Sequence, residues 1–253
     1  MKFLTYKTGK EEIELIPLSD LHLGSPESNL REIERVVRYI REKENARTIL
    51  LGDLFETAII GSKGDPYTAD PIETEFRIAK ELLKPIKDKI LAVISGNHER
   101  RISKTVGLDI MRMFCAKLGI EDRYSPNFVV VKLRLKNLSY FIGAHHGVGG
   151  GRLKGGKINN LHRMGGILPN ADIILMGHTH DFIMTTDVKY IIDKKHDRIK
   201  EHKTYYINVP AFLSYGGYGA SYAYQPTISG AIKITLKDGS QSSKKNRIEI
   251  SQF

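Results

Sequence analysis

The sequence predicts an α/β fold, because short apolar runs alternate along the chain with segments of amphipathic helical pattern. Three apolar runs predict buried strands in the first part of the chain, at residues 12–18, 48–51 and 90–95. Amphipathic patterns at residues 29–44 and 70–84 predict the two helices between them. With 253 residues and 41% hydrophobic content, the simplest expectation is a single domain over residues 1–253.

Capping and helix-breaking residues set the expected limits of the helices. Asn29 is predicted as the N-cap of the first helix, with Glu32 behind it. Asp70-Pro71 opens the second helix, which ends before Pro85. A third helix is expected to end at Gly119. The apolar positions of this third helix are Leu108, Met111, Phe114, Cys115 and Leu118.

The C-terminal half is expected to complete the β-structure. Apolar or alternating runs predict strands at residues 128–135, 139–144, 172–176, 182–192, 204–209 and 227–236. A basic, glycine-dense loop is predicted at residues 147–156. Residues 151–157 come close to a phosphate-binding P-loop, but Ile158 stands where Ser or Thr must hold magnesium, which disfavours that motif. Two interpretations stay open, a flexible basic loop beside a phosphate site and a basic structural turn.

The composition limits the partners and the compartment. The formal charge of +10 favours anionic partners, among which nucleic acid is the obvious candidate. The only cysteine, Cys115, excludes an internal disulfide and a zinc site built from several thiolates. The N-terminus lacks an apolar leader pattern, and no segment approaches the about 20 apolar residues of a membrane span. We therefore expect a cytoplasmic protein with no membrane partner, and an oligomer stays an open alternative.

Polar motifs rich in Asp, Asn and His follow five of the apolar runs. In order, they are Asp20-Leu21-His22, Gly52-Asp53, Gly96-Asn97-His98-Glu99, His145-His146-Gly147 and Gly177-His178-Thr179-His180. Ligands gather at strand ends in open α/β sheets, and alternate residues of an extended segment project to one side, so His178 and His180 are expected to face one small ion. Imidazole, carboxylate and amide ligands suit Mn²⁺, Fe or Zn²⁺. One such histidine pair is more often ordinary polar packing, so the prediction depends on the five motifs together.

In this order, the five motifs resemble those of the calcineurin-like metallophosphoesterases, over the whole span from Asp20 to His180. The resemblance implies a sandwich of two mixed β-sheets flanked by α-helices, with strands in residues 181–253 completing the sheets. It also implies a hydrolase with two divalent metal ions, for which Mn²⁺ is preferred and Fe, Zn²⁺ or Ni²⁺ are alternatives. Water activated by two such ions attacks phosphorus directly, so no covalent phosphoenzyme is needed.

The same resemblance implies roles for individual residues. One metal would be held by Asp20, His22 and His180, and the other by Asn97, His146 and His178, with Asp53 bridging the two. His146 is preferred over His145 because it immediately precedes glycine. His98 would be the catalytic acid. Glu56, three residues after Asp53, would orient His98, and an exposed surface glutamate is the alternative.

The motifs are most similar to those of the DNA-repair exonuclease branch and the related small subunit of archaeal replicative polymerases. Ser/Thr protein phosphatases carry Arg-Gly after the second motif, where this chain has Thr57-Ala58. We therefore expect a phosphodiesterase, and in particular a DNA-binding nuclease, with Arg100, Arg101 and Arg152 as phosphate contacts. One alternative is a phosphomonoesterase acting on proteins or small nucleotides. The other is a non-catalytic nucleic-acid-binding accessory subunit, which would have lost metal ligands, whereas none is missing here.

A glycine-rich segment near the C-terminus carries four tyrosines, Tyr215, Tyr218, Tyr222 and Tyr224. Tyrosine rings in such a segment could stack nucleobases. Amphipathic packing around a turn is the alternative, and it needs no ligand.

Overall fold

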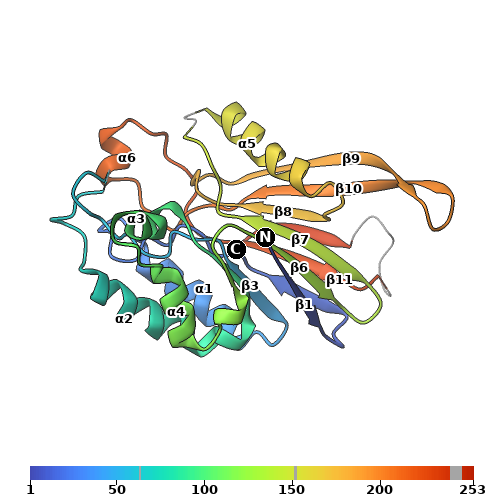
Figure 1. The fold of residues 1–253 in the computed structure, drawn as a ribbon, viewed down its shortest axis with the longest axis horizontal. Helices are drawn as coiled ribbons and strands as arrows, with labels where there is room; N and C mark the ends of the chain where they lie inside the picture. Colours follow the sequence, from blue (N-terminus) through green and yellow to red (C-terminus); the bar gives the residue numbers. More distant parts are fainter. Residues whose placement is uncertain (63, 151–152, 240–246) are drawn as a thin grey trace.

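The computed structural model describes residues 1–62, 64–150, 153–239 and 247–253 (Figure 1). Within these residues, the strands form two six-stranded sheets that pack face to face. In order across the first sheet, the strands are β1 (Lys2–Lys7), β6 (Phe128–Arg134), β7 (Ser139–His145), β8 (Ile173–Met176), β10 (Arg198–Asn208) and β9 (Ile183–Asp193). Across the second sheet they are β12 (Ile248–Gln252), β11 (Ile232–Lys237), β2 (Glu12–Leu15), β3 (Ala46–Leu50), β4 (Ile90–Ile94) and β5 (Tyr124–Ser125). Both sheets mix parallel and antiparallel pairs, which confirms the predicted fold class.

Helices cover the outer face of each sheet. The second sheet is covered by α1 (Leu30–Glu42), α2 (Ile72–Leu83) and α4 (Ile110–Leu118), and the first by α5 (Lys154–Ile167). The remaining helical segments are α3 (Asn97–Val106), α6 (Gly217–Ser221) and the 3-10 turns η1 (Lys84–Lys89) and η2 (Glu121–Arg123). Figure 1 shows α3 and α6 at one end of the molecule and the long β9–β10 hairpin reaching out at the other. None of the helices in the described ranges is both long and apolar enough to cross a membrane.

Side-chain alternation along β3 and β4 lets the second sheet contribute to two cores. Ile49 and Ile94 face the first sheet and pack with Ile142 of β7. Leu50 and Val93 point to the opposite face, where they pack under the helices. Because both faces of these central strands are buried, their sequences are continuous apolar runs, which made them predictable.

The predicted helix limits are largely confirmed. Asn29 caps α1 by accepting a main-chain N–H one turn ahead at 3.2 Å, and α2 lies between the two prolines as expected. The third predicted helix ends at Gly119. It begins later than expected, because Asp109 caps α4 by accepting the Arg112 N–H at 3.0 Å. Leu108 therefore lies outside the helix and is exposed.

The expected loop at residues 147–156 is wrong at its C-terminal end, because α5 begins at Lys154. Four glycines within this helix obscure its helical pattern in the sequence. One of them, Gly165, lies against the ring of Tyr206, where any Cβ would collide. Glycine at this position therefore allows the helix to approach the sheet closely.

Two predicted strands are shorter than expected, and several elements were not predicted. β2 ends at Leu15, after which isolated bridges join Leu18 to Leu50 and Leu23 to Phe55. β11 begins at Ile232 rather than at residue 227. β1 and β12 lie at sheet edges and are largely exposed or half-buried, so their sequences lack a strong apolar pattern. The helix α3 is polar, and its buried residues are limited to His98, Glu99 and Ile102.

Three aromatic rings support the loop that follows β3. Phe55 in that loop stacks on Phe76 of α2 at 4.7 Å between ring centroids, and Phe114 of α4 meets both rings edge-on at 5.3 and 5.6 Å. Phe114 is fully buried, whereas Met113 beside it is 49% exposed.

Phe114→Ala is expected to lower the free energy of unfolding by about 3–5 kcal/mol, because it removes a ring from a close-packed core and leaves a cavity. Chemical denaturation of the variant and the parent protein measures this difference. Met113→Ala on the same helix is the matched control, and it should change stability by no more than about 0.5 kcal/mol. Equal losses in both variants would contradict the packing described here.

Candidate metal centre

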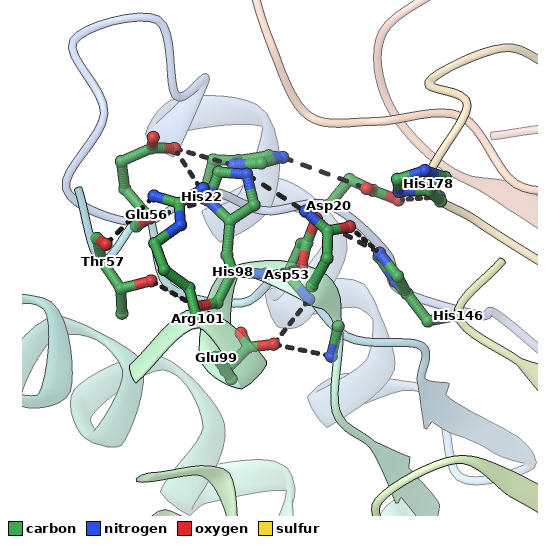
Figure 2. A network of polar contacts seen from close by, with 12 residues as sticks. Asp20, His22, Asp53, Glu56, Thr57, His98, Glu99, Arg101, His146 and His178 are labelled. Atoms are coloured by element: carbon green, nitrogen blue, oxygen red, sulfur yellow. Dashed lines mark hydrogen bonds and ion pairs between the residues drawn. The ribbon is translucent and has the colours of Figure 1, made fainter. Parts of the chain in front are cut away.

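The five polar motifs lie at the carboxyl ends of β2, β3, β4, β7 and β8, and three residues of the motif after β4, Asn97, His98 and Glu99, form the first turn of α3. The strands β2, β3 and β4 are parallel neighbours in one sheet, and β7 and β8 are parallel neighbours in the other. Parallel strands present their carboxyl ends at the same edge. Figure 2 shows the resulting convergence of side chains from all five motifs into one polar network.

The first group of candidate ligands consists of Asp20, His22 and His180. Asp20 Oδ1 lies 3.1 Å from His180 Nε2, and the Nε2 atoms of His22 and His180 are 3.3 Å apart. Asp20 Oδ1 is buried, and no hydrogen-bond donor satisfies it within the described part of the chain. A buried carboxylate oxygen without a hydrogen bond is costly, whereas a divalent cation would satisfy this oxygen and both imidazoles. The donor set therefore fits a metal ion.

The second group consists of Asp53, His146 and His178, with Asn97 beside them. His146 Nε2 lies 3.2 Å from Asp53 Oδ2 and 2.9 Å from Asn97 Oδ1. The adjacent His145 lies outside the group and is only half-buried. Nitrogen and oxygen donors of these types again suit Mn²⁺, Fe or Zn²⁺. Asp53 belongs to this second group, and its bridging role toward the first group stays a prediction.

In three of the candidate ligand histidines, one ring nitrogen forms a hydrogen bond that fixes the orientation of the ring. His146 Nδ1 and His178 Nε2 donate to main-chain carbonyls at 2.7 and 2.8 Å. His22 Nδ1 lies 2.8 Å from a carboxylate oxygen of Glu56. Because these partners are acceptors, the nitrogen that contacts them carries a proton, and the other ring nitrogen is the atom that would bind a metal once the ring is neutral.

Glu56 is buried and contacts two histidines in different ways. Its main-chain carbonyl accepts the hydrogen bond from His98 Nδ1 at 2.7 Å. Its carboxylate contacts His22 and lies farther, at 3.6 Å, from His98 Nδ1. The orientation of His98 thus depends mainly on the main chain of Glu56, whereas the sequence predicted that the carboxylate would orient it. The contact between Glu56 and His22 was not predicted.

Burial and charge determine the protonation of these groups in the metal-free protein. Burial lowers the pKa of His98 to about 4, so Nε2 must gain a proton before His98 acts as an acid. Burial alone would lower the pKa of His22, but the hydrogen bond and charge of Glu56, together with nearby aspartates, raise it to about 9. Although burial opposes it, His146 and His98 hold the pKa of Asp53 well below its ordinary value. The carboxylates therefore stay ionised and favour positive charge between them.

Five of the candidate ligands have a left-handed backbone, which residues other than glycine rarely adopt. Their φ angles are +53° at Asp20, +45° at His22, +50° at Asp53, +66° at His178 and +51° at His180. The extended geometry expected for His178 and His180 is therefore wrong, and the turn directs one histidine to each ligand group. Such conformations cost on the order of 1–3 kcal/mol each and persist where surrounding contacts hold them.

Glu99 joins two of the motif loops, a role that its motif does not reveal. Its carboxylate accepts four main-chain N–H groups, from Gly96 at 2.7 Å, Leu54 at 2.8 Å, and Asp53 and Phe55 at 3.1 Å. The two loops also touch directly, because a Cβ on Gly96 would collide with Asp53. Burial and the charge of Asp53 raise the pKa of Glu99 to about 7. Glu99 lies three residues after Gly96, the N-cap residue of α3, which is the capping-box position of a helix. This spacing was the signal in the sequence that could have revealed the structural role of Glu99.

Comparison with known proteins identifies the family. Residues 16–182 match the sequence profile of the calcineurin-like phosphoesterases. The chain belongs to this family. The match spans all five motifs, so the resemblance inferred from them is confirmed.

Three solved structures are similar to this phosphoesterase at low sequence identity. A conserved uncharacterized protein of Streptococcus pneumoniae TIGR4, described as a predicted phosphoesterase, is 15% identical, with 96% of this chain and 98% of that chain covered and a TM-score of 0.38. Vps29 of Entamoeba histolytica, complexed with Zn²⁺, is 12% identical, with 95% and 98% covered and a TM-score of 0.43. GAP50 of Plasmodium, described as the anchor in the inner membrane complex, is 11% identical, with 95% and 84% covered and a TM-score of 0.48. The comparison with curated protein sequences gave no significant match.

Two of the three predicted phosphate-contact arginines of this phosphoesterase lie on α3, beside the candidate ligands. Arg100 Nε donates to the Gly96 carbonyl at 2.9 Å, and Arg101 Nη1 donates to the Thr57 carbonyl at 3.1 Å. These main-chain contacts anchor both guanidinium groups and leave further N–H donors on each. Arg152 lies outside the described residues.

Glu75 of α2 supports the loop after Asp53, and the sequence did not single it out. The side chain is fully buried, and its Oε1 accepts the Thr57 N–H at 3.0 Å. Thr57 itself has a left-handed backbone, with φ of +44°. Burial raises the pKa of Glu75 to about 8, so the protonated carboxyl predominates at neutral pH.

This raised pKa predicts that stability falls as pH rises. Because the pKa of Glu75 is higher in the folded than in the unfolded state, this group contributes stability that is fully present below the unfolded-state pKa. That stability is lost as pH rises through the folded-state pKa of about 8. Glu75→Gln keeps an acceptor for Thr57 and cannot ionise, so its melting temperature should fall less than that of the parent between pH 6 and 9. Thermal unfolding followed by circular dichroism measures the difference. Glu73→Gln on the exposed face of α2 should retain the parental pH profile, and a parental profile in Glu75→Gln would disprove the assignment.

The contact between Glu56 and His22 predicts an effect on metal affinity. Carboxylate partners of ligand histidines fix the ring and raise its basicity, and losing one typically costs about 10–100-fold in affinity. Glu56→Gln should therefore weaken Mn²⁺ binding by about that factor in titration calorimetry, with one class of sites affected more than the other. Glu73→Gln again serves as the control. Unchanged affinity at both classes of sites would show that Glu56 does not act through His22.

Proposed function

We propose that this chain is a phosphodiesterase with a dinuclear metal site, and that its substrates are nucleic acids. The observation that carries the proposal is the turn at residues 178–180, which contributes His178 to one ligand group and His180 to the other. The main-chain N–H of His178 also donates to Asp20 Oδ2 at 2.9 Å, so the two groups are tied together. Asp53 is the residue proposed to bridge them.

Two divalent ions in this site, with Mn²⁺ as the leading candidate, would supply an activated water and offset charge on the phosphoryl oxygens. The chain's own residues orient the substrate and move the proton. His98 donates through Nδ1 to the main chain, so Nε2 is the atom left to face the centre, 4.0 Å from Asp53 Oδ2. His98 Nε2 takes up a proton from solvent water and delivers it to the leaving oxygen. Arg100 and Arg101 bind the non-bridging phosphate oxygens through their remaining N–H donors.

Charge and space support a nucleic-acid substrate. The chain carries a formal charge of +10, which favours polyanions. The cavity over the candidate ligands has a volume of about 990 Å³, and its wall includes the exposed Lys154 and also Lys157, which forms an ion pair with Asp181 at 3.2 Å. Such a volume accommodates a ligand far larger than a simple phosphate monoester.

The single cysteine, Cys115, is buried and unpaired, which suits the reducing cytoplasm that we propose as the compartment.

A substrate panel tests the proposal directly. With Mn²⁺, the purified protein should hydrolyse bis-p-nitrophenyl phosphate faster than p-nitrophenyl phosphate, and it should cleave labelled DNA or RNA. Activity on the monoester alone would refute the diesterase proposal. Binding of nucleic acid without any hydrolysis would instead indicate an accessory subunit. Cleavage that persisted in Asp53→Asn would be assigned to a contaminant.

His98→Ala should lower kcat by about 10²–10⁴-fold, the range that general acid catalysis supplies. Metal content should remain unchanged, because His98 is outside both proposed ligand sets. Steady-state kinetics and elemental analysis of the same preparation check both expectations. His196→Ala, in the exposed turn between β9 and β10, is the matched control. Full activity in His98→Ala with both metals bound would refute the assignment.

A further inference from the structure

Two grooves meet at the candidate metal centre. The larger is the cavity of about 990 Å³, which contains Asp53, His98 and His180. The smaller has a volume of about 540 Å³ and follows α3 away from the centre. The grooves share four lining residues, Asn97, Arg101, Gly149 and His178. The candidate ligands Asn97 and His178 therefore lie at the junction, so a substrate bound there can extend into both grooves.

The smaller groove, here called the α3 groove, is basic. Arg100, Arg101 and Lys104 line it, and Lys104 lies one helical turn beyond the two adjacent arginines on α3. Among the described residues, no carboxylate forms an ion pair with these three cations. Lys104 is exposed at the outer part of the helix, whereas the two arginines are partly buried. Unpaired cations along a groove that leads from a phosphate site suit further phosphates of the same chain.

The larger cavity has an aromatic wall on the segment that includes α6. Tyr215 and Tyr222 are 57% and 46% exposed, and both line the cavity with Tyr224. The rings of Tyr222 and Tyr224 lie 6.4 Å apart and are inclined by 33°. The start of the segment is anchored near the centre, because Phe212 N–H donates to the Asp20 carbonyl at 3.1 Å. Accessible aromatic rings beside a phosphate site suit the faces of nucleobases.

We propose that the substrate is a single-stranded oligonucleotide that crosses the metal centre and occupies both grooves. A base on one side of the scissile phosphate stacks on Tyr222, and phosphates on the other side contact Lys104 in the α3 groove. A single strand is required because bases in a duplex are already paired and stacked, so their faces are not available to a tyrosine. This inference rests on the proposed phosphodiesterase function and specifies its substrate class.

Kinetics on long and short substrates test the two grooves separately. The readout is the ratio of KM for a single-stranded 12-mer to KM for bis-p-nitrophenyl phosphate, which has no base and no further phosphate. Tyr222→Ala should raise this ratio by about 5–150-fold, the equivalent of about 1–3 kcal/mol for one base stack. Lys104→Ala should raise it by about 3–10-fold and reduce the dependence of log KM on log salt by about 0.7, as loss of one phosphate contact on a single strand requires.

Matched surface variants control for unspecific effects. Lys117→Ala on the exposed face of α4 and Tyr190→Ala on the exposed β9 strand should leave the ratio unchanged. Equal losses on both substrates in Tyr222→Ala and Lys104→Ala would indicate a structural role and overturn the inference. A parental ratio in both variants, or faster cleavage of the duplex 12-mer than of the single strand, would overturn it as well. If the parent protein hydrolysed neither substrate, the proposed function itself would fail.

Discussion

A single buried carboxylate fixes the spacing of the loops on which the candidate metal centre depends. Glu99 accepts four main-chain N–H groups from the loops after β3 and β4, which matches the number of lone pairs that a carboxylate offers. It is therefore saturated and serves as a structural tie rather than a ligand. The positions of Asp53 and Asn97 follow from this tie, and the close approach at Gly96 leaves no space for a side chain between the two loops.

The parts of this structure that were predictable are those encoded within a single segment. The central strands β3 and β4 are buried on both faces, so they read as apolar runs, and their polar ends read as candidate ligands. The cap at Asn29 and the limits of α2 also depend on neighbouring residues alone. The sets of candidate ligands came from the family resemblance, and the structure brings the members of each set together.

The parts that were missed depend on contacts between distant segments or on backbone angles. Glu75 contacts Thr57 from another helix, and nothing near either residue in the sequence indicates the pairing. The helix α5 is rich in glycine because it packs closely on Tyr206, and the same glycines made it read as a loop. The left-handed turn at His178 and His180 carries no local glycine or asparagine at those positions, so the sequence suggested an extended segment.

The left-handed backbone conformation of the candidate ligands lowers the stability of the fold, although their side chains supply the atoms that a metal would need. Glycine or asparagine would occupy these backbone angles at lower cost than histidine, whereas loss of the Asp20 carboxylate would also leave the His178 N–H without the acceptor that it contacts at 2.9 Å. Every such replacement would also delete a candidate ligand. The histidines at these positions are therefore less favourable for folding than glycine would be, but a metal site requires the ligand atoms that they supply. A bound cation would also offset the free-energy cost of these backbone conformations, because an ion that binds only the native state stabilises that state.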